Sequence, residues 1–197
     1  MSKKVLLINA LVIIFFSSLS SAFEKNAQDL VQNTTDNAKK IILDKSISDE
    51  SKKKQIEKIA LDVVDVDGLG RFTLGSERKN LSKDQLNKYK KTFRVFFSKN
   101  ISSRLQNYSD QDIKVIGSKK ISENYVMVNS KMISKKEGQE ISIDWRVFKV
   151  NNKLVIRDLV VEGLSLAKTQ RQEFSSILAS KGFDGLISSL EDFISKN

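Results

Sequence analysis

Apolar residues with helical spacing dominate the first half of the chain beyond residue 22. They recur at three- and four-residue steps from Phe23 to about Asp44, from Ser48 to about Val64, and from Ser82 to about Tyr108. The last of these segments opens with the capping box Ser82-Lys-Asp-Gln85 and carries a broad aromatic stripe. The stretch from Asp65 to Gly75 is expected to form a short helix that ends at the glycine. The pattern predicts four helices before the first strand.

The apolar period shifts to two after Tyr108, which predicts strands. Four strands are expected, at residues 112–117, 121–133, 140–150 and 154–161. Asn151-Asn152 is short enough to form a hairpin turn between the last two. Helical spacing returns from Lys168 to Lys181 and from Asp184 to Ser195, with Gly182 as the cap between them. Helices therefore bracket a four-stranded antiparallel sheet, which is an α+β fold.

The last predicted strand, residues 154–161, carries apolar side chains on both faces. Strict alternation divides them into two sets, with Leu154, Ile156 and Val160 on one face and Val155, Leu159 and Val161 on the other. An antiparallel strand with one face in water should instead alternate apolar with polar residues. Each face must therefore be covered by a helix, a second sheet or a bound apolar molecule.

The chain of 197 residues contains no histidine and no cysteine. Disulfides, thiolate nucleophiles, imidazole triads and the usual zinc ligand sets are therefore excluded, and no metal site is expected. Asp158 and Glu162 share a predicted strand face, but four residues of strand separate them by ~13 Å. Paired glycosidase carboxylates lie only ~5 to 9.5 Å apart. Both residues are expected at the surface, and no catalytic residue is assigned.

The first 22 residues have the features of a secretory signal peptide. Lys3 and Lys4 precede an apolar stretch from Val5 to Phe16, and small residues follow up to Ala22. Because the stretch is short for a membrane span, cleavage after Ala22 is expected, with an uncleaved anchor as the alternative. Residues 23–197 would then form a single domain. The formal net charge of +10 favours an acidic partner, but an exported protein is not expected to meet nucleic acid.

Three segments carry a specific pattern: Ile143-Asp-Trp-Arg146, Arg157-Asp-Leu-Val-Val-Glu-Gly-Leu-Ser165 and Lys181-Gly-Phe-Asp-Gly-Leu186. Upstream of them, Leu74-Gly75 is followed by Gln85, Phe93 and Phe96 on the aromatic helix. In this order the segments resemble the MlaC family, the soluble periplasmic component of the intermembrane phospholipid transport system, which is related to toluene-tolerance proteins. The resemblance covers most of residues 56 to 190.

The resemblance implies a phospholipid carrier with no cofactor and no enzymatic activity. The acyl chains would lie in an apolar cleft between helices and sheet, with the headgroup outside. The carrier would be a periplasmic monomer that moves lipid between an outer-membrane lipoprotein complex and an inner-membrane ABC transporter complex with its membrane-anchored substrate-binding subunit, contributing to outer-membrane lipid asymmetry. The candidate wall residues of the cleft are Phe93, Phe96, Phe97, Ile101, Tyr125, Met127, Trp145, Val147, Leu159, Val161 and Leu164.

Two other functions stay open on the residues themselves. An enzyme with a cone-shaped α+β pocket for small hydrophobic substrates would need a carboxylate or Tyr125 projecting into the cavity with a shifted pKa. An envelope chaperone or adaptor would have a filled interior and would use its basic faces on partner proteins. The carrier differs from the adaptor because it requires more apolar lining than its own side chains fill, and from the enzyme because it needs no acid or base in the cavity.

Overall fold

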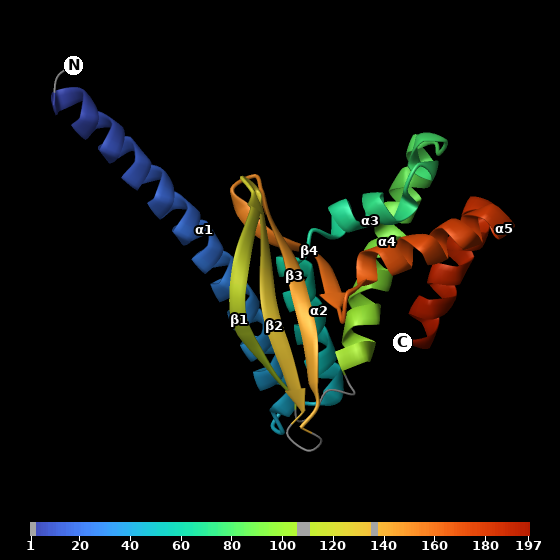
Figure 1. Cartoon of the computed structure of the whole chain (residues 1–197). Helices are drawn as coiled ribbons and strands as arrows, with labels where there is room; N and C mark the ends of the chain where they lie inside the picture. Colours follow the sequence, from blue (N-terminus) through green and yellow to red (C-terminus); the bar gives the residue numbers. More distant parts are fainter. Residues whose placement is uncertain (1–2, 106–110, 135–137) are drawn as a thin grey trace.

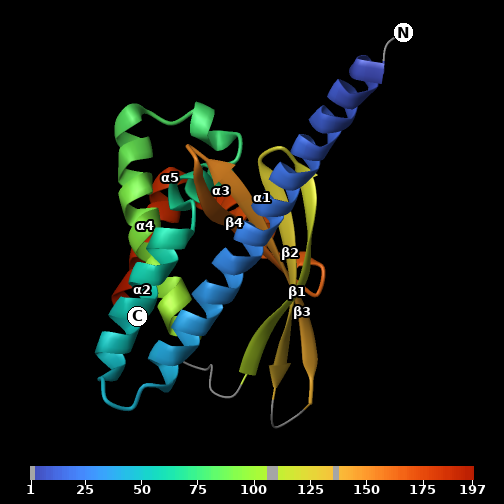
Figure 2. The same ribbon diagram turned by 90° about the vertical axis from the view of Figure 1, so that its left-hand side faces the viewer.

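A helical group and an antiparallel sheet lie side by side (Figure 1). The computed structural model describes the backbone of residues 3–105, 111–134 and 138–197, with side chains for residues 22–104, 111–134 and 138–197. The helices are α1 (Lys3–Leu43), α2 (Asp49–Val63), α3 (Val66–Leu74), the short 3-10 turn η1 (Glu77–Lys79), α4 (Lys83–Leu105) and α5 (Leu166–Lys196). Figure 2 shows α1 and α2 together on one face of the sheet.

The sheet contains five strands in sequential order: β1 (Gln111–Ser122), β2 (Tyr125–Ser134), β3 (Glu140–Val150), β4 (Lys153–Val161) and β5 (Leu164–Ser165). All neighbours are antiparallel, so the predicted α+β class is confirmed. The prediction of four strands missed β5, because two residues are too few for alternation to be visible. Asn151 and Asn152 have φ of 47° and 65° and form the predicted hairpin turn.

The predicted turn at residues 118–120 is wrong. β1 continues through these residues to Ser122, and the turn follows at Glu123 and Asn124. The strand register shifts between Val115 and Gly117, so a bulge interrupts the alternation that would have marked one continuous strand. Lys119, which is exposed, and Lys120, which is half-buried, are strand residues rather than turn residues.

A second bulge, at Arg157 in β4, corrects the predicted strand faces. Arg146 pairs with Asp158 while Val147 pairs with Ile156, so Arg157 is the extra residue on its strand. An added residue inverts the alternation beyond it. Ile156, Leu159 and Val161 therefore belong to the same apolar cluster instead of lying on opposite faces.

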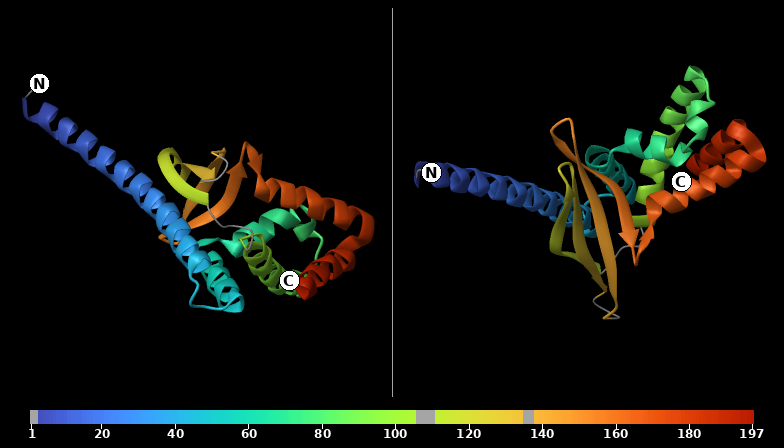
Figure 3. Two further views of the ribbon diagram at one scale, coloured as in Figure 1. Left: turned by 90° about the horizontal axis from the view of Figure 1, so that it is seen from below. Right: turned by 45° about the horizontal axis from the view of Figure 1, so that its top comes forward.

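Glycines end or bend two helices where the sequence predicts it. Gly75 caps α3 with a φ of 61°, a conformation that side chains other than glycine rarely adopt. Gly182, with φ 67°, interrupts α5, which folds back on itself at this point (Figure 3). The predicted end of the aromatic helix near Tyr108 lies outside the described residues, since α4 is described to Leu105.

Helix α1 begins at Lys3 rather than at Phe23, and its first turns extend away from the rest of the molecule (Figure 1). The signal peptide, whose side chains up to residue 21 lie outside the described residues, stays a prediction. Within the described part of the chain, no helix combines the length and the apolar character that crossing a membrane requires.

Two apolar clusters form the interior. The helical cluster joins α3, α4 and α5 around Tyr89, Phe93, Phe96 and Phe174, whose rings pack in stacked, tilted and edge-to-face arrangements. The sheet cluster packs α1 against one face of the strands, and includes Ala27, Val31, Val126, Val128 and Val147 with no exposed surface. The two clusters adjoin at β4, which contacts α2, α3 and α5 and carries Ile156 of the sheet cluster. A cavity at this boundary lies between the helices and the sheet.

Candidate ligand-binding cavity

A cavity of about 420 Å³ lies where the two apolar clusters meet. Its volume falls within the ~300–1,000 Å³ typical of small-molecule sites. The apolar residues of its lining come from α1–α5, β1, β3, β4 and the residue after α2, and are Ala38, Ile42, Ile56, Ile59, Ala60, Val63, Val64, Leu69, Phe93, Phe96, Phe97, Ile101, Ile113, Trp145, Ile156, Leu159, Leu166 and Ala167. Apolar side chains from almost every element thus surround a space that they do not fill.

The structure brings more than half of the predicted wall residues to this cavity: Phe93, Phe96, Phe97, Ile101, Trp145 and Leu159. The α4 residues reach it because the aromatic stripe lies three and four positions apart on one helix face. Contact of these residues with a bound lipid stays a prediction. Their convergence on one space is the part of the site that helical and strand periodicity could foresee.

The remaining predicted wall residues lie outside the cavity. Tyr125 and Met127 lie on the other face of β2, because strand alternation turns the buried Val126 and Val128 toward the helices. Val147 and Val161 belong to the sheet cluster and are covered by packing. Leu164 is 62% exposed in the short strand β5.

Two helices contribute lining that was not assigned from the sequence. Thr34, Ala38 and Ile42 of α1 and Ile59 of α2 reach the cavity. The spacing of apolar residues along both helices predicts that one face of each packs toward the core. Helical spacing shows which face of a helix is apolar, but not which residues of that face contact a neighbouring element and which line a cavity. That division depends on tertiary packing.

Trp145 presents an apolar ring to the cavity because its one polar atom is already satisfied. The indole Nε1–H donates to Ser130 Oγ at 2.9 Å, and this hydroxyl donates to the carbonyl of Ile143 at 3.0 Å. Ser130 is 2% exposed, so the pair is internal to the sheet cluster. Trp145 therefore offers no free hydrogen-bonding group to a ligand.

Asp65 and Arg157 form an ion pair that ties the junction of α2 and α3 to the bulge in β4. The Arg157 Nε and Nη2 atoms lie 2.8 and 2.7 Å from Asp65 Oδ2, while Asp65 Oδ1 accepts from the Gly68 N–H. Burial raises the pKa of Asp65, but the hydrogen bonds from Gly68 and Arg157 outweigh it, so the pKa lies below its ordinary value. The pair is thus ionised at the edge of the cavity.

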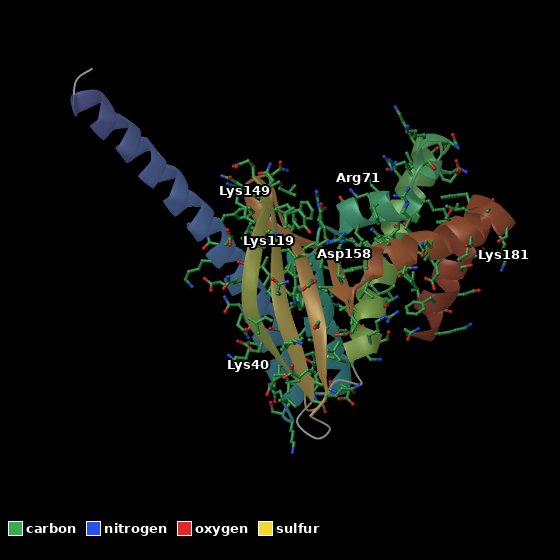
Figure 4. All side chains as sticks on the ribbon, in the orientation of Figure 1. Lys40, Arg71, Lys119, Lys149, Asp158 and Lys181 are labelled. Carbon is green, nitrogen blue, oxygen red and sulfur yellow. The ribbon has the colours of Figure 1, made fainter. Side chains whose placement is uncertain are left out.

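Asp158 corrects the expectation of a surface position. Its side chain is 6% exposed and lies between the sheet and α5 (Figure 4). The carboxylate accepts from Ser165 Oγ at 2.6 Å and from the Ala167 N–H at 2.9 Å, and Arg146 Nη1 lies 3.4 Å away. Asp158 therefore caps the start of α5. Glu162, the other carboxylate of the predicted face, is exposed as expected.

The two tyrosines in the described part of the chain, Tyr89 and Tyr125, provide no acid–base group in the cavity. Burial raises the pKa of Tyr89, whose hydroxyl lies 2.7 Å from Thr73 Oγ1 within the helical cluster. Burial also raises the pKa of Tyr125, which stacks on Phe148 on the sheet face away from the cavity. No group of acidic side chains suited to a metal ion occurs in the described residues.

The fold and the cavity define an α+β binding domain with an internal apolar site. The family model for "MlaC protein" matches residues 31–192, and the chain belongs to this family. A relative from Haemophilus influenzae, named "Intermembrane phospholipid transport system binding protein MlaC", is 26% identical over 139 residues, which are 69% of this chain and 65% of that protein. The match thus spans slightly less than two thirds of the relative's length.

A solved structure shares the fold. It is a phospholipid-binding protein from Ralstonia solanacearum in complex with a phospholipid, with a TM-score of 0.72 and 19% sequence identity. The match covers 86% of this chain and 97% of the other. The arrangement of helices around one face of an antiparallel sheet is therefore common to both.

Proposed function

We propose that this protein is a phospholipid carrier that buries acyl chains in the cavity and leaves the headgroup at its opening. The observation that carries the proposal is the apolar space of about 420 Å³ between the helical and sheet clusters. The phospholipid bound by the Ralstonia solanacearum protein of the same fold supports it.

The lining suits an acyl chain better than a polar ligand. Each buried methylene group contributes about 0.8 kcal/mol, so affinity can come from chain length alone. Trp145 and the phenylalanines of α4 present rings without free polar atoms. Binding of this kind needs no cofactor.

The carrier would work in the periplasm as a monomer. Cleavage after Ala22 would release residues 23–197 there as a single domain. It would exchange phospholipid with an outer-membrane lipoprotein complex and with an inner-membrane ABC transporter through that transporter's membrane-anchored subunit. The name of the Haemophilus influenzae relative supports a place in such an intermembrane system.

Enzymatic activity is not part of this proposal. Tyr125, the tyrosine that an enzyme would have used, lies on the sheet face away from the cavity. The carboxylate of Asp158 accepts hydrogen bonds from Ser165 and from the Ala167 N–H at the start of α5, and it pairs with Arg146.

Mass spectrometry of organic extracts from the purified, exported protein tests the proposal. Phospholipid is expected at a stoichiometric ratio to protein. A protein that is free of lipid and takes up none from vesicles would contradict the carrier and favour an adaptor. Turnover of a small hydrophobic substrate would favour the enzyme.

A further inference from the structure

The solvent-exposed part of the cavity lining lies on the last turn of α4 and the first turns of α5, and we take it as the opening of the cavity. The members of the lining that are exposed to solvent are Arg104, Leu166, Thr169 and Glu173. Arg104 lies on α4 and the other three on α5, whereas the lining from α2 and β3 is buried or half-buried. A ligand that fills the apolar space would therefore present its polar end to these two helices.

Most charged side chains of the lining are neutralised by an opposite charge. Lys39 pairs with Asp112 of β1. Arg157 pairs with Asp65, and the carboxylate of Asp158 with Arg146. The first two pairs join helical segments to the sheet and the third joins β3 to β4, and each leaves little net charge for a ligand.

Arg104 and Glu173 are held differently, each by a neutral amide. Arg104 Nε donates to Asn100 Oδ1 at 2.6 Å, and Glu173 Oε2 accepts from Gln170 Nε2 at 2.7 Å. All four residues line the cavity, and neither Arg104 nor Glu173 has an ion-pair partner within the described residues. An amide orients a charged group without cancelling its charge. The opening thus carries one oriented cation and one oriented anion on opposite helices.

We propose that Arg104 and Glu173 form a headgroup site for a zwitterionic phospholipid with a primary amine. The Arg104 guanidinium binds the phosphate, for which its planar set of donors is suited. The Glu173 carboxylate accepts hydrogen bonds from the ammonium group. This site rests on the proposed carrier function and adds to it a preference between headgroups.

An anionic headgroup fits the same opening less well. Phosphatidylglycerol offers a phosphate to Arg104, but its glycerol hydroxyls bring no positive charge to Glu173. The carboxylate then lies near a net negative headgroup without compensation. Because both side chains are exposed, the preference is expected to be about two- to five-fold, which is the range of an ion pair in water.

Loading from vesicles with equal amounts of phosphatidylethanolamine and phosphatidylglycerol, with identical acyl chains, tests the site. The ratio of the two lipids bound to the full exported protein is measured by mass spectrometry at low and at high salt. The wild-type protein is expected to favour phosphatidylethanolamine. The substitution Glu173→Lys places two cations at the opening and should shift the ratio toward phosphatidylglycerol.

Glu191→Lys is the matched control, because it makes the same charge change at an exposed site of α5 outside the lining. A shift in Glu173→Lys but not in Glu191→Lys supports the headgroup site. Bound lipid with the same ratio as the vesicles in all three proteins overturns the site and leaves the carrier function intact. Absence of bound lipid in the wild-type protein instead overturns the carrier function itself.

Discussion

A charged side chain at Ile101 should weaken lipid binding without unfolding the protein. Ile101 lines the cavity on the same helix as Phe93 and Phe96, but it is half-buried whereas they are 2% and 7% exposed. The change Ile101→Asp puts a carboxylate where an acyl chain is expected to pass. Three or four methylene groups would then lose their apolar contact, which at ~0.8 kcal/mol each is about 3 kcal/mol. Affinity should fall about 100-fold.

Transfer of a fluorescent phospholipid from vesicles to the protein measures this loss. Ile101→Leu keeps the apolar wall and should bind as the wild type does. Ile116→Asp makes the identical chemical change at a β1 residue that is 59% exposed and outside the lining, so it should also bind normally. Circular dichroism checks that each variant is folded. A folded Ile101→Asp protein with the affinity of Ile116→Asp would refute the assignment of this wall.

Three further predictions concern the residues that hold the cavity in place. Asp158→Asn should lower the free energy of unfolding by about 1 kcal/mol, because the cap of α5 loses its charge, and urea unfolding measures this. The pKa of Asp65 is lower in the folded protein than its ordinary value of 3.8. Its contribution to the free energy of unfolding is therefore complete above pH 3.8, and is lost as the pH falls through the lowered pKa of the folded state. The stability difference between wild type and Asp65→Asn should therefore shrink in acid, and a constant difference would contradict the ion pair with Arg157. Gly182→Ala should lower the free energy of unfolding by about 1–3 kcal/mol, because alanine is strained at a φ of 67°. Steric overlap does not contribute, since nothing lies within 4 Å of the added Cβ.

The helical half of the molecule was predictable because its signals are local. The serine cap of α2, the glycine at the end of α3 and the glycine inside α5 each act within one turn of backbone. The aromatic stripe of α4 likewise follows from the spacing along a single helix. Such features need no knowledge of the neighbouring elements.

The sheet half was less predictable because bulges carry no local signal. Alternation was extrapolated through Arg157, where one extra residue reverses the faces of β4. Tyr125 and Met127 were assigned to the cavity because both faces of β2 are apolar, and the choice of face depends on where α1 packs. The burial of Asp158 was missed for a similar reason, since its partner α5 begins only after the strand has ended.

The extra residue in β4 has a consequence for how this strand tolerates change in length. With Arg157 present, Leu159 lies beside the cavity and Asp158 reaches the start of α5. Deleting Arg157 would leave Ile156 and Asp158 as consecutive residues opposite Val147 and Arg146, so every side chain from Asp158 to Val161 would keep its present face. Loss of this one residue would therefore remove the ion pair with Asp65 without changing the face on which Leu159 lies.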